Sequence, residues 1–391
     1  MISTEKSQEM LAFLRSRRPA MLRLLKRFVM CESPTDSKPA VDRFGRVLAA
    51  EWKKRGVKIE FLPQKRAGNH VRVAWLSNLT RGNGISARAG QILVLGHLDT
   101  VYGLGTIKKM PFRVTRERAF GPGIFDMKGG LVIALFAAEA LARAKWLSRR
   151  RIVFLWTSDE ETGSQSSREV IEREARRSMA VLVLEPANGP KGKLKTRRKA
   201  VGTVDLIITG RAAHAGLDPA AGVNAVHELA LQAARLMRLN NPRRGITVNP
   251  TIAQGGTRSN VIPAEALLTI DLRAETIGDM RRIERKLKTL RPILPGARVT
   301  VQGGFSRPPL ERGASAALFS HAQEIAHQLG FSIDECLAGG GSDGNFTAAL
   351  GVPTLDGLGA VGAAAHSPDE QVIISALPDR AALLASLLAT L

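Results

Sequence analysis

Residues 151–164 constrain the fold most, because an apolar run of strand length ends there abruptly in three consecutive acids. A run that is apolar at every position, without alternation, indicates a strand buried on both faces of a parallel sheet. The acids then follow the carboxyl end of the strand, the edge where ligands bind in open α/β sheets. Glu160 and Glu161 are adjacent and point in different directions, so one could bind a cation while the other transfers a proton. An acidic turn that caps the next helix through Ser158 or Asp159 is the alternative.

Two further segments place metal-binding side chains after apolar or glycine-rich stretches. His97 and Asp99 follow an apolar run, and their spacing of two places both on one face of an extended chain. This spacing is expected when a histidine binds a metal and a carboxylate orients it; a structural histidine beside a turn aspartate is the alternative. Asp126 lies in the glycine-rich turn 121–130, which lacks both the Walker spacing and GxGxxG. We therefore favour a metal-binding aspartate over a phosphate loop.

The same pattern occurs twice more along the chain. Glu185 ends the apolar run 180–184, and His366 follows a predicted strand at 352–355 and a glycine-rich connection. Five groups thus follow five buried runs and should converge at one edge of one sheet: His97, Asp126, Glu161, Glu185 and His366.

These five groups have the chemistry of a two-metal hydrolytic site. Imidazole and carboxylate without thiolate suit zinc, cobalt or manganese, and the set is too rich in histidine for calcium. Five ligands are too many for one catalytic zinc with an open position, but they suit two ions if one carboxylate bridges. Two such ions, roughly 3.5 to 4 Å apart, lower the pKa of a shared water and polarise a carbonyl. Glu160 is then left to take the water's proton and return it to a leaving amine.

Seven motifs over nearly the whole chain are similar to those of peptidase family M20: GHLDTV, GPGIFDMKGG, SDEETGS, LEPA, GRAAHAG, GGTRSNVIPAEALLTIDLR and HSPDE. Within this family of dizinc exopeptidases and deacylases, the greatest likeness is to the bacterial glutamate carboxypeptidases. The resemblance implies two Zn²⁺ sites, with Co²⁺ or Mn²⁺ as substitutes, formed by His97, Asp126 and Glu185 and by Asp126, Glu161 and His366. It also implies that Asp99 steers His97 and that Glu160 is the general base.

The predicted fold is α/β: a mostly parallel sheet flanked by helices, with a smaller inserted α+β domain. The middle of the chain has helix and strand patterns but no cluster of metal-type ligands, which indicates a separate domain. A basic linker at 191–199 and the pair Pro308 and Pro309 mark its ends. The predicted domains are a catalytic domain in two parts, 1–198 and 309–391, and an inserted domain, 199–308. The resemblance implies that the inserted domain is a lid and dimerisation domain.

Residues outside the metal cluster receive roles from the same resemblance. His214 would stabilise the oxyanion of the tetrahedral intermediate, often in the partner subunit; a surface histidine is the alternative. Asn260 and Arg273 match family positions that contact a substrate carboxylate, for which a guanidinium is well suited. Arg273 on a strand could equally be structural. The remaining substrate-binding candidates are Arg307, Gly340 and Ser342.

The composition limits partners and location. The formal charge is +22, but the positive residues are dispersed and there is one tyrosine, so nucleic acid is not the favoured partner. A basic exterior would instead draw anionic substrates. There is no apolar run of about 18 residues, and basic residues interrupt the amino terminus. We therefore expect a cytoplasmic protein without a membrane segment. Two distant cysteines, Cys31 and Cys336, fit a reducing compartment.

Two local predictions concern the first part of the chain. Helical spacing predicts a helix over 10–29. His70, alone in a polar link between two predicted strands, is expected on the surface.

The predicted function is a dizinc metallohydrolase that removes a carboxyl-terminal amino acid, with glutamate as the first candidate, from peptides or N-acyl conjugates. The substrate would be small and anionic, and the enzyme a homodimer through its inserted domain. The alternative within the family is a deacylase or deacetylase of N-acyl amino acids, because acyl-group preference depends on the shape of loops. A basic scaffold that binds nucleic acid or a partner is the alternative from another class, and the complete ligand set argues against it.

Overall fold

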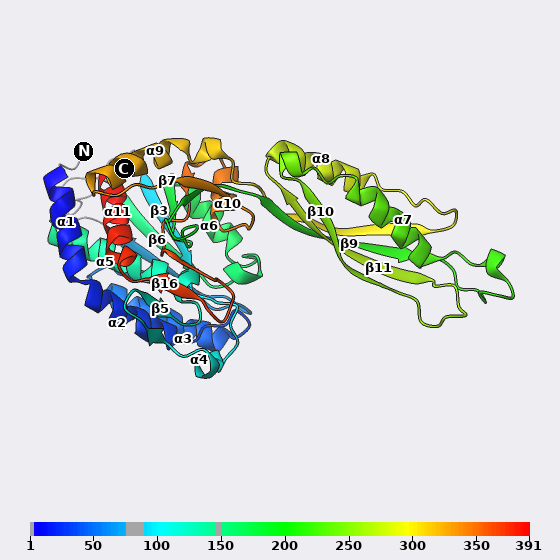
Figure 1. Ribbon diagram of the computed structural model, residues 1–391, viewed down its shortest axis with the longest axis horizontal. Coiled ribbons are helices and arrows are strands. Elements are labelled where there is room, and N and C mark those ends of the chain that lie inside the picture. The colour runs from blue at the N-terminus through cyan, green and yellow to red at the C-terminus, as the bar shows by residue number, and fades with distance from the viewer. Residues whose placement is uncertain (1–3, 76–89, 146–149) are drawn as a thin grey trace. The chain divides into compact units, whose positions relative to one another are not determined.

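The computed structural model describes residues 4–75, 90–145 and 150–391 (Figure 1). The chain divides into two compact units. The first unit comprises Met1–Thr196, Arg312–Ala338 and Ser342–Leu391, and the second comprises Arg197–Glu311 and Gly339–Gly341. The second unit is therefore an insertion into the sequence of the first.

The first unit is built on a six-stranded sheet with parallel central strands. In spatial order its strands are β1 (Lys58–Leu62), β2 (His70–Trp75), β6 (Arg151–Thr157), β3 (Gln91–His97), β7 (Ser178–Val183) and β14 (Thr354–Leu355). The strands from β6 to β14 pair in parallel, whereas the β1–β2 and β2–β6 pairs are antiparallel. This sheet confirms the predicted α/β class.

The central strands are apolar at nearly every position because helices cover both faces of the sheet. On β3, which is buried along its whole length, Ile92 and Val94 belong to one apolar core and Leu93 and Leu95 to another. The first core includes side chains of α1 (Thr4–Ser16), α2 (Arg18–Val29), α3 (Lys38–Lys53), α5 (Gly129–Arg143), α9 (Ala316–Gln328) and α11 (Ala376–Thr390). The second includes side chains of α6 (Arg168–Ala175) and α10 (Gly344–Ala349).

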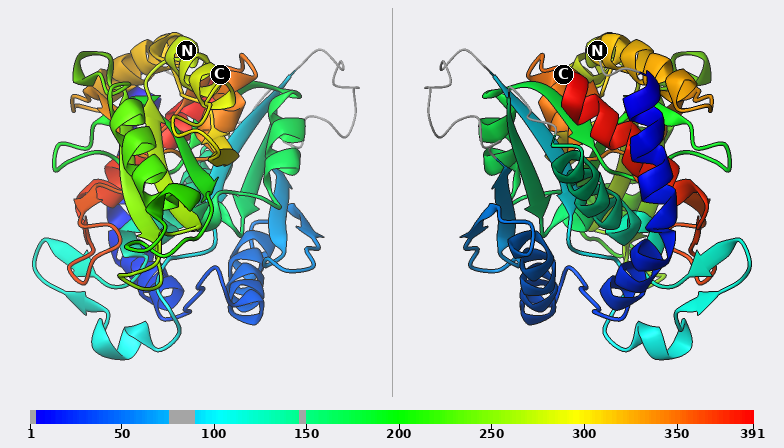
Figure 2. Two further views of the ribbon diagram at one scale, coloured as in Figure 1. Left: turned by 90° about the vertical axis from the view of Figure 1, so that its right-hand side faces the viewer. Right: turned by 90° about the vertical axis from the view of Figure 1, so that its left-hand side faces the viewer.

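The two ends of the chain meet on the first core. In the right-hand view of Figure 2, the blue α1 lies beside the red α11, and the two helices are in contact.

In the part of the chain that the structure describes, no helix has both the length and the apolar character needed to cross a membrane.

Smaller elements hold the loops around the sheet. A second sheet has the order β15 (Gly362–Ala363), β16 (Gln371–Ile373), β5 (Arg118–Phe120) and β4 (Arg113–Val114). The other elements are α4 (Thr106–Lys109) and the pair β8 (Leu194–Arg198) and β13 (Glu335–Ala338). The segment that carries His366 runs from β15 to β16, so this small sheet anchors it at both ends.

The predicted helix over 10–29 is wrong, because it is two helices. α1 ends at Ser16, and α2 begins at Arg18 with Pro19 in its first turn. Proline has no backbone N–H to donate and is tolerated at a helix start but not in its interior. The strand predicted at 352–355 is shorter for a related reason: β14 begins only after Pro353.

The second unit is an α+β structure. Its antiparallel sheet has the order β10 (Thr247–Gly255), β11 (Glu265–Ala274), β9 (Ala200–Thr209) and β12 (Arg298–Arg307). Burial alternates along β9 and β11, so one face of the sheet is apolar. Helices α7 (Ala225–Met237) and α8 (Ile277–Lys288) cover that face and share its core.

Candidate active site

Side chains suited to metal binding and proton transfer gather where the parallel strands of the first unit end. His97 ends β3, Asp126 lies in the turn Ile124–Lys128 before α5, Glu160 and Glu161 lie in the turn Glu160–Thr162 after β6, Glu185 follows β7, and His366 follows β15. Because β6, β3 and β7 are neighbours and parallel, their carboxyl ends meet at one edge of the sheet. The local fold therefore brings together groups that are far apart in sequence.

The two carboxylate oxygens of Asp126 face two different histidines. Oδ1 lies 3.1 Å from His97 Nε2, and Oδ2 lies 3.5 Å from His366 Nε2. His97 Nε2 also lies 3.5 Å from Glu185 Oε1, and His366 Nε2 lies 3.3 Å from Glu161 Oε2. Asp126 therefore stands between a His97–Glu185 pair and a His366–Glu161 pair.

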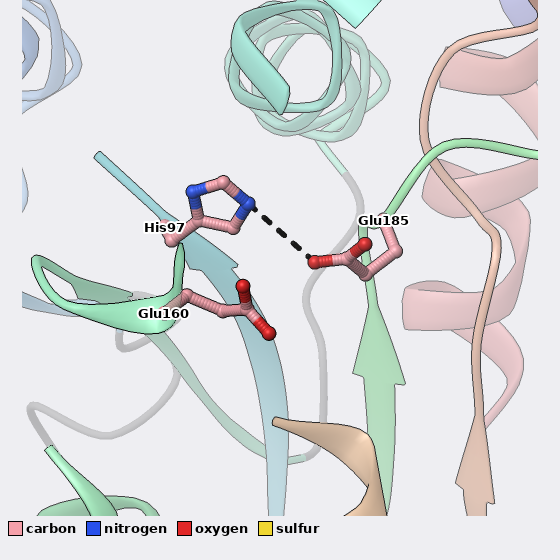
Figure 3. A group of neighbouring side chains, drawn as sticks. All are labelled: His97, Glu160 and Glu185. Carbon is pink, nitrogen blue, oxygen red and sulfur yellow. Dashed lines mark ion pairs between the residues drawn. The ribbon is translucent and has the colours of Figure 1, made fainter. Parts of the chain in front are cut away.

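The ligand-type atoms are close enough to share ions. One atom each from His97, Asp126 and Glu161 lie within 4.8 Å of one another, and so do atoms from His97, Glu160 and Glu185. Figure 3 shows the second group, in which the imidazole of His97 and the carboxylates of Glu160 and Glu185 lie close together. Glu160 is thus beside the cluster, where a proton carrier would have to be.

The charges of the cluster favour bound cations. Burial opposes a charge on His97, but its hydrogen bonds to Asp126 and Asp99 outweigh burial and raise its pKa well above the usual value. Hydrogen bonds to Asp126 and Glu161 raise the pKa of His366 to about 10. Burial acts to raise the pKa of Asp126, but both histidines outweigh it and hold that pKa below its usual range. The carboxylates draw positive charge to this place, and a divalent cation would replace protons there.

The surroundings of Glu161 show whether the residues of the cluster fit a metal ion. Its side chain is 8% exposed, and burial raises the pKa of its carboxyl. Its Oε1 has no hydrogen-bond partner among the described residues. A buried carboxylate oxygen without a partner is costly unless it binds an ion. With histidine and carboxylate donors and no thiolate, the cluster fits zinc, cobalt or manganese.

Asp99 holds the loop of the two glutamates as well as His97. Its Oδ1 accepts the backbone N–H of Glu160 at 3.3 Å, and its Oδ2 accepts that of Glu161 at 3.2 Å. Thr35 also donates its hydroxyl to Oδ2 at 2.8 Å. His97 Nδ1 lies 2.9 Å from the backbone carbonyl oxygen of Asp99 and 3.5 Å from its Oδ1. The carboxylate of Asp99 therefore has a second task beyond the predicted steering of His97, which is to fix the two acids after β6.

The prediction that His70 lies on the surface is wrong. His70 begins β2, is fully buried, and lies with Nδ1 2.9 Å from the hydroxyl of Ser158. Burial lowers its pKa. Asp159 is also buried and accepts the backbone N–H and the hydroxyl of Ser166 at 2.6 and 2.8 Å. These contacts hold both sides of the loop that carries the two glutamates, so a polar partner network replaces the solvent expected around a lone histidine.

The other predicted residues lie mainly in the second unit, which contains His214, Asn260, Arg273, Arg307 and Gly340, whereas Ser342 lies in the first. The structure brings His214 and Asn260 together, because Ala215 donates its N–H to the carbonyl oxygen of Asn260 at 2.9 Å. His214 is exposed, and its Nδ1 accepts the N–H groups of Gly216 and Leu217 at 3.2 and 3.0 Å. A neutral His214 ring therefore carries its proton on Nε2.

Two of these residues have contacts that also serve the fold, and a third is buried. Arg273 makes two hydrogen bonds to Asp271, at 3.0 and 2.8 Å. Arg307 is 5% exposed. Ser342 is fully buried and donates its hydroxyl to Asp356 at 2.6 Å. Their roles in substrate binding stay predictions, and the contacts of Arg273 and Ser342 favour a structural contribution.

Sequence reasoning missed two residues beside the cluster, Glu370 and Tyr102. Glu370 is fully buried, and its carboxylate accepts backbone N–H groups of the turn that carries Asp126. Tyr102 donates its hydroxyl to the same carboxylate. Backbone donors leave no trace in residue identity, so the only signal was an acid four positions after His366.

The comparison with protein families shows which family the chain belongs to. A model described as peptidase family M20/M25/M40 matches residues 93–390. The chain belongs to this family. The predicted family is thereby confirmed, and the chain is a hydrolase whose cluster of histidines and carboxylates could hold the metal on which the M20 peptidases depend.

Similar proteins agree with this membership of the M20 family. The chain is 34% identical over 378 residues to carboxypeptidase G2 of Pseudomonas sp. (strain RS-16), with 95% of this chain and 89% of that protein covered. It is 28% identical over 359 residues to succinyl-diaminopimelate desuccinylase of Leptothrix cholodnii, with 85% and 89% covered. The crystal structure of aminopeptidase PepT from Bacillus cereus matches with a TM-score of 0.79 and 20% identity, over 95% of this chain and 98% of that one. The last likeness concerns the fold alone.

Proposed function

We propose that this chain is a two-zinc exopeptidase that releases a carboxyl-terminal amino acid, with glutamate as the first candidate, from small peptides or N-acyl conjugates. The observation that carries the proposal is the position of Asp126, whose two oxygens face His97 on one side and His366 on the other. The family match and the 34% identity with carboxypeptidase G2 support hydrolysis of an amide bond.

The ligands divide into two sites that share Asp126. The proposed sets are His97, Asp126 and Glu185 for one ion, and Asp126, Glu161 and His366 for the other. Two Zn²⁺ ions bound there would lower the pKa of a shared water and polarise the scissile carbonyl. Co²⁺ and Mn²⁺ suit the same donors. The three carboxylates offset most of the positive charge of two divalent ions. The net charge of the occupied site would therefore be small, which lowers the cost of burying it.

Glu160 is the proposed proton carrier. Its carboxylate oxygen lies within 4.8 Å of ligand atoms of His97 and Glu185. Its backbone is held by the hydrogen bond to Asp99 at 3.3 Å. A carboxylate fixed beside the cluster can accept a proton from the attacking water and deliver it to the leaving amine nitrogen.

His214 is the proposed donor to the oxyanion that forms on the scissile carbonyl. Because the N–H groups of Gly216 and Leu217 occupy Nδ1, a neutral ring presents an Nε2–H donor. In the homodimer that we propose, formed through the second unit, this donor would serve the site of the partner subunit. Asn260 is proposed to contact the carboxylate of an anionic substrate, and Arg307 to face the same substrate.

A deacylase is the second candidate, because the chain is 28% identical to a desuccinylase. The two candidates break the same kind of amide bond and differ in which side of it the enzyme recognises. An exopeptidase recognises the leaving amino acid and its free α-carboxylate, whereas a deacylase recognises the acyl group. The family match leaves the basic nucleic-acid scaffold without support.

The test varies the two sides of the amide independently. One series keeps an N-benzoyl group and changes the amino acid among glutamate, alanine and ornithine; another keeps glutamate and exchanges benzoyl, acetyl, succinyl and an aminoacyl residue. We expect kcat/KM to follow the amino acid in the first series and to change little in the second. The matched control, N-benzoylglutamate with its α-carboxylate amidated, should not be cleaved. A kcat/KM that follows the acyl group, with the amidated substrate cleaved normally, would identify a deacylase.

A further inference from the structure

The carboxylate of Glu370 is fully buried, and both of its oxygens are engaged. Oε1 accepts the backbone N–H groups of Phe125 and Asp126 at 2.8 and 2.9 Å. Oε2 accepts the backbone N–H of Gly123 at 3.2 Å and the hydroxyl of Tyr102 at 2.5 Å. An ionised carboxylate has about four acceptor positions, and here four donors occupy them.

Through these bonds Glu370 joins three segments that are remote in sequence. The first is the turn at 123–126, which carries Asp126. The second contains Tyr102, whose hydroxyl also lies 3.0 Å from the carbonyl oxygen of Ser367. The third is the segment from His366 to Glu370, whose backbone is further tied to the turn by the hydrogen bond from Gly121 N–H to the carbonyl oxygen of Glu370 at 3.2 Å.

Glu370 acts on the cluster through other residues. It holds the main chain of Asp126, while the side chain of Asp126 faces His97 and His366. The segment that contains His366 is held to the same turn by the hydrogen bond from Gly121 N–H to the carbonyl oxygen of Glu370. Partners that orient metal ligands in this way determine affinity, and their loss commonly weakens metal binding by about 10-fold to 100-fold.

We propose that Glu370 is a positioning residue that sets the distance between Asp126 and His366 and so forms the second metal position. This inference rests on the proposed two-metal function. It predicts an asymmetry: the position formed by Asp126, Glu161 and His366 has two ligands on segments tied by Glu370, whereas the position with His97 and Glu185 has only Asp126. Loss of Glu370 should therefore weaken the second ion more than the first.

Glu370→Gln is the sharpest variant, because the amide has nearly the shape of the carboxylate but presents N–H groups in place of one oxygen. Where that nitrogen replaces Oε2, it faces the N–H of Gly123, and two donors then oppose each other. Tyr102→Phe removes one of the four donors while leaving the carboxylate in place. Asp369→Asn is the matched control, since Asp369 is the exposed neighbouring acid.

The readout is stepwise binding of Co²⁺ to the metal-free full-length protein, followed by visible absorption and checked by elemental analysis after dialysis. We expect two ions in the parent and in Asp369→Asn. In Glu370→Gln one of the two ions should lose at least 10-fold in affinity while the other changes less than threefold, and Tyr102→Phe should show the same asymmetry to a smaller degree.

Three outcomes would overturn the inference. Two ions bound to Glu370→Gln with parental affinities would leave the proposed function standing but remove the role of Glu370. Equal weakening of both ions would mean that Glu370 supports the unit as a whole and no particular position. If Glu370→Gln does not fold, Tyr102→Phe decides, and parental binding of both ions by that variant refutes the role. A parent that binds no ion at this cluster would refute the proposed function itself.

Discussion

Gly359→Ala should displace Glu185 without removing any polar group from the site. A Cβ at Gly359 would lie 2.1 Å from the carbonyl oxygen of Leu184 and 2.8 Å from that of Glu185, and real Cβ atoms essentially never approach other atoms below 3.0 Å. Gly359 does not have a positive φ, so the added methyl group causes a steric conflict and no backbone strain. The end of β7 or the Gly359 segment must therefore move by about 0.9 Å or more.

A movement of this size exceeds what a preorganised site tolerates. Catalytic groups must stay within about 0.5 Å of their working positions, and a misplacement of about 1 Å can reduce the rate by about 100-fold. We therefore expect kcat/KM to fall by about 100-fold, which corresponds to about 2.7 kcal/mol of transition-state stabilisation. Overpacking of the core should also lower the free energy of unfolding by about 1–3 kcal/mol.

The measurement compares kcat/KM, metal affinity and the free energy of unfolding in denaturant for Gly359→Ala and a matched control. Gly313→Ala makes the same chemical change where no atom lies within 4 Å of the new Cβ, so it should resemble the parent. If Gly359→Ala folds and keeps both metal affinity and kcat/KM within about twofold of the parent, then the Gly359 segment moves in place of the end of β7, and the reasoning that this contact positions Glu185 is refuted.

Four further changes test other parts of the structure. Glu160→Gln should retain both metal ions and lower kcat by about 10²-fold to 10⁴-fold; loss of an ion in elemental analysis would instead make Glu160 a ligand. His214→Ala should lower kcat by about 10²-fold to 10³-fold with metal content unchanged, and mixing it with the Glu160 variant should restore activity if His214 serves the partner subunit, whereas no restoration would place its action within one chain or nowhere. Arg72→Leu should lower the free energy of unfolding by about 1.5–3 kcal/mol at pH 7, because it removes the 3.1 Å ion pair with the 2% exposed side chain of Glu174 and leaves that carboxylate with Gln91 at 3.1 Å and Arg177 at 3.8 Å. Burial opposes the charge of Glu174, but Arg72, together with Gln91 and Arg177, outweighs burial and holds the pKa below the usual value, so the stabilisation from Arg72 is present above about pH 4.5 and is lost as the pH falls further; a loss that persists unchanged in acid would contradict the assignment. Ala364→Gly should raise the free energy of unfolding by about 0.5–1 kcal/mol, because Ala364 has φ 66°, and a clear decrease would show that its methyl group is needed for packing.

The sheet and the metal-type cluster could be predicted because both depend on side-chain pattern. Strands β3 and β6 are apolar at nearly every position since two cores cover them, and that pattern is visible in the sequence. The polar residues at the carboxyl ends of such strands then lie together at one edge of the sheet. This is why His97 and Glu161 could be placed together before any coordinates.

The supporting contacts could not be predicted because they join side chains to main chain. Asp99 accepts the N–H groups of the loop after β6, and Glu370 accepts those of the turn before α5. Backbone N–H groups are the same in every residue but proline, so sequence does not reveal which carboxylate they meet. His70 was misplaced for a similar reason, because the burial of a polar side chain depends on partners such as Ser158 that only the fold supplies.

The central claim is that paired ions share Asp126, and anomalous diffraction from zinc-loaded crystals tests it most directly. Data collected on both sides of the zinc absorption edge should show two peaks per chain, both bonded to Asp126, one beside His97 and the other beside His366. A single peak, or two peaks that do not share Asp126, would contradict this account.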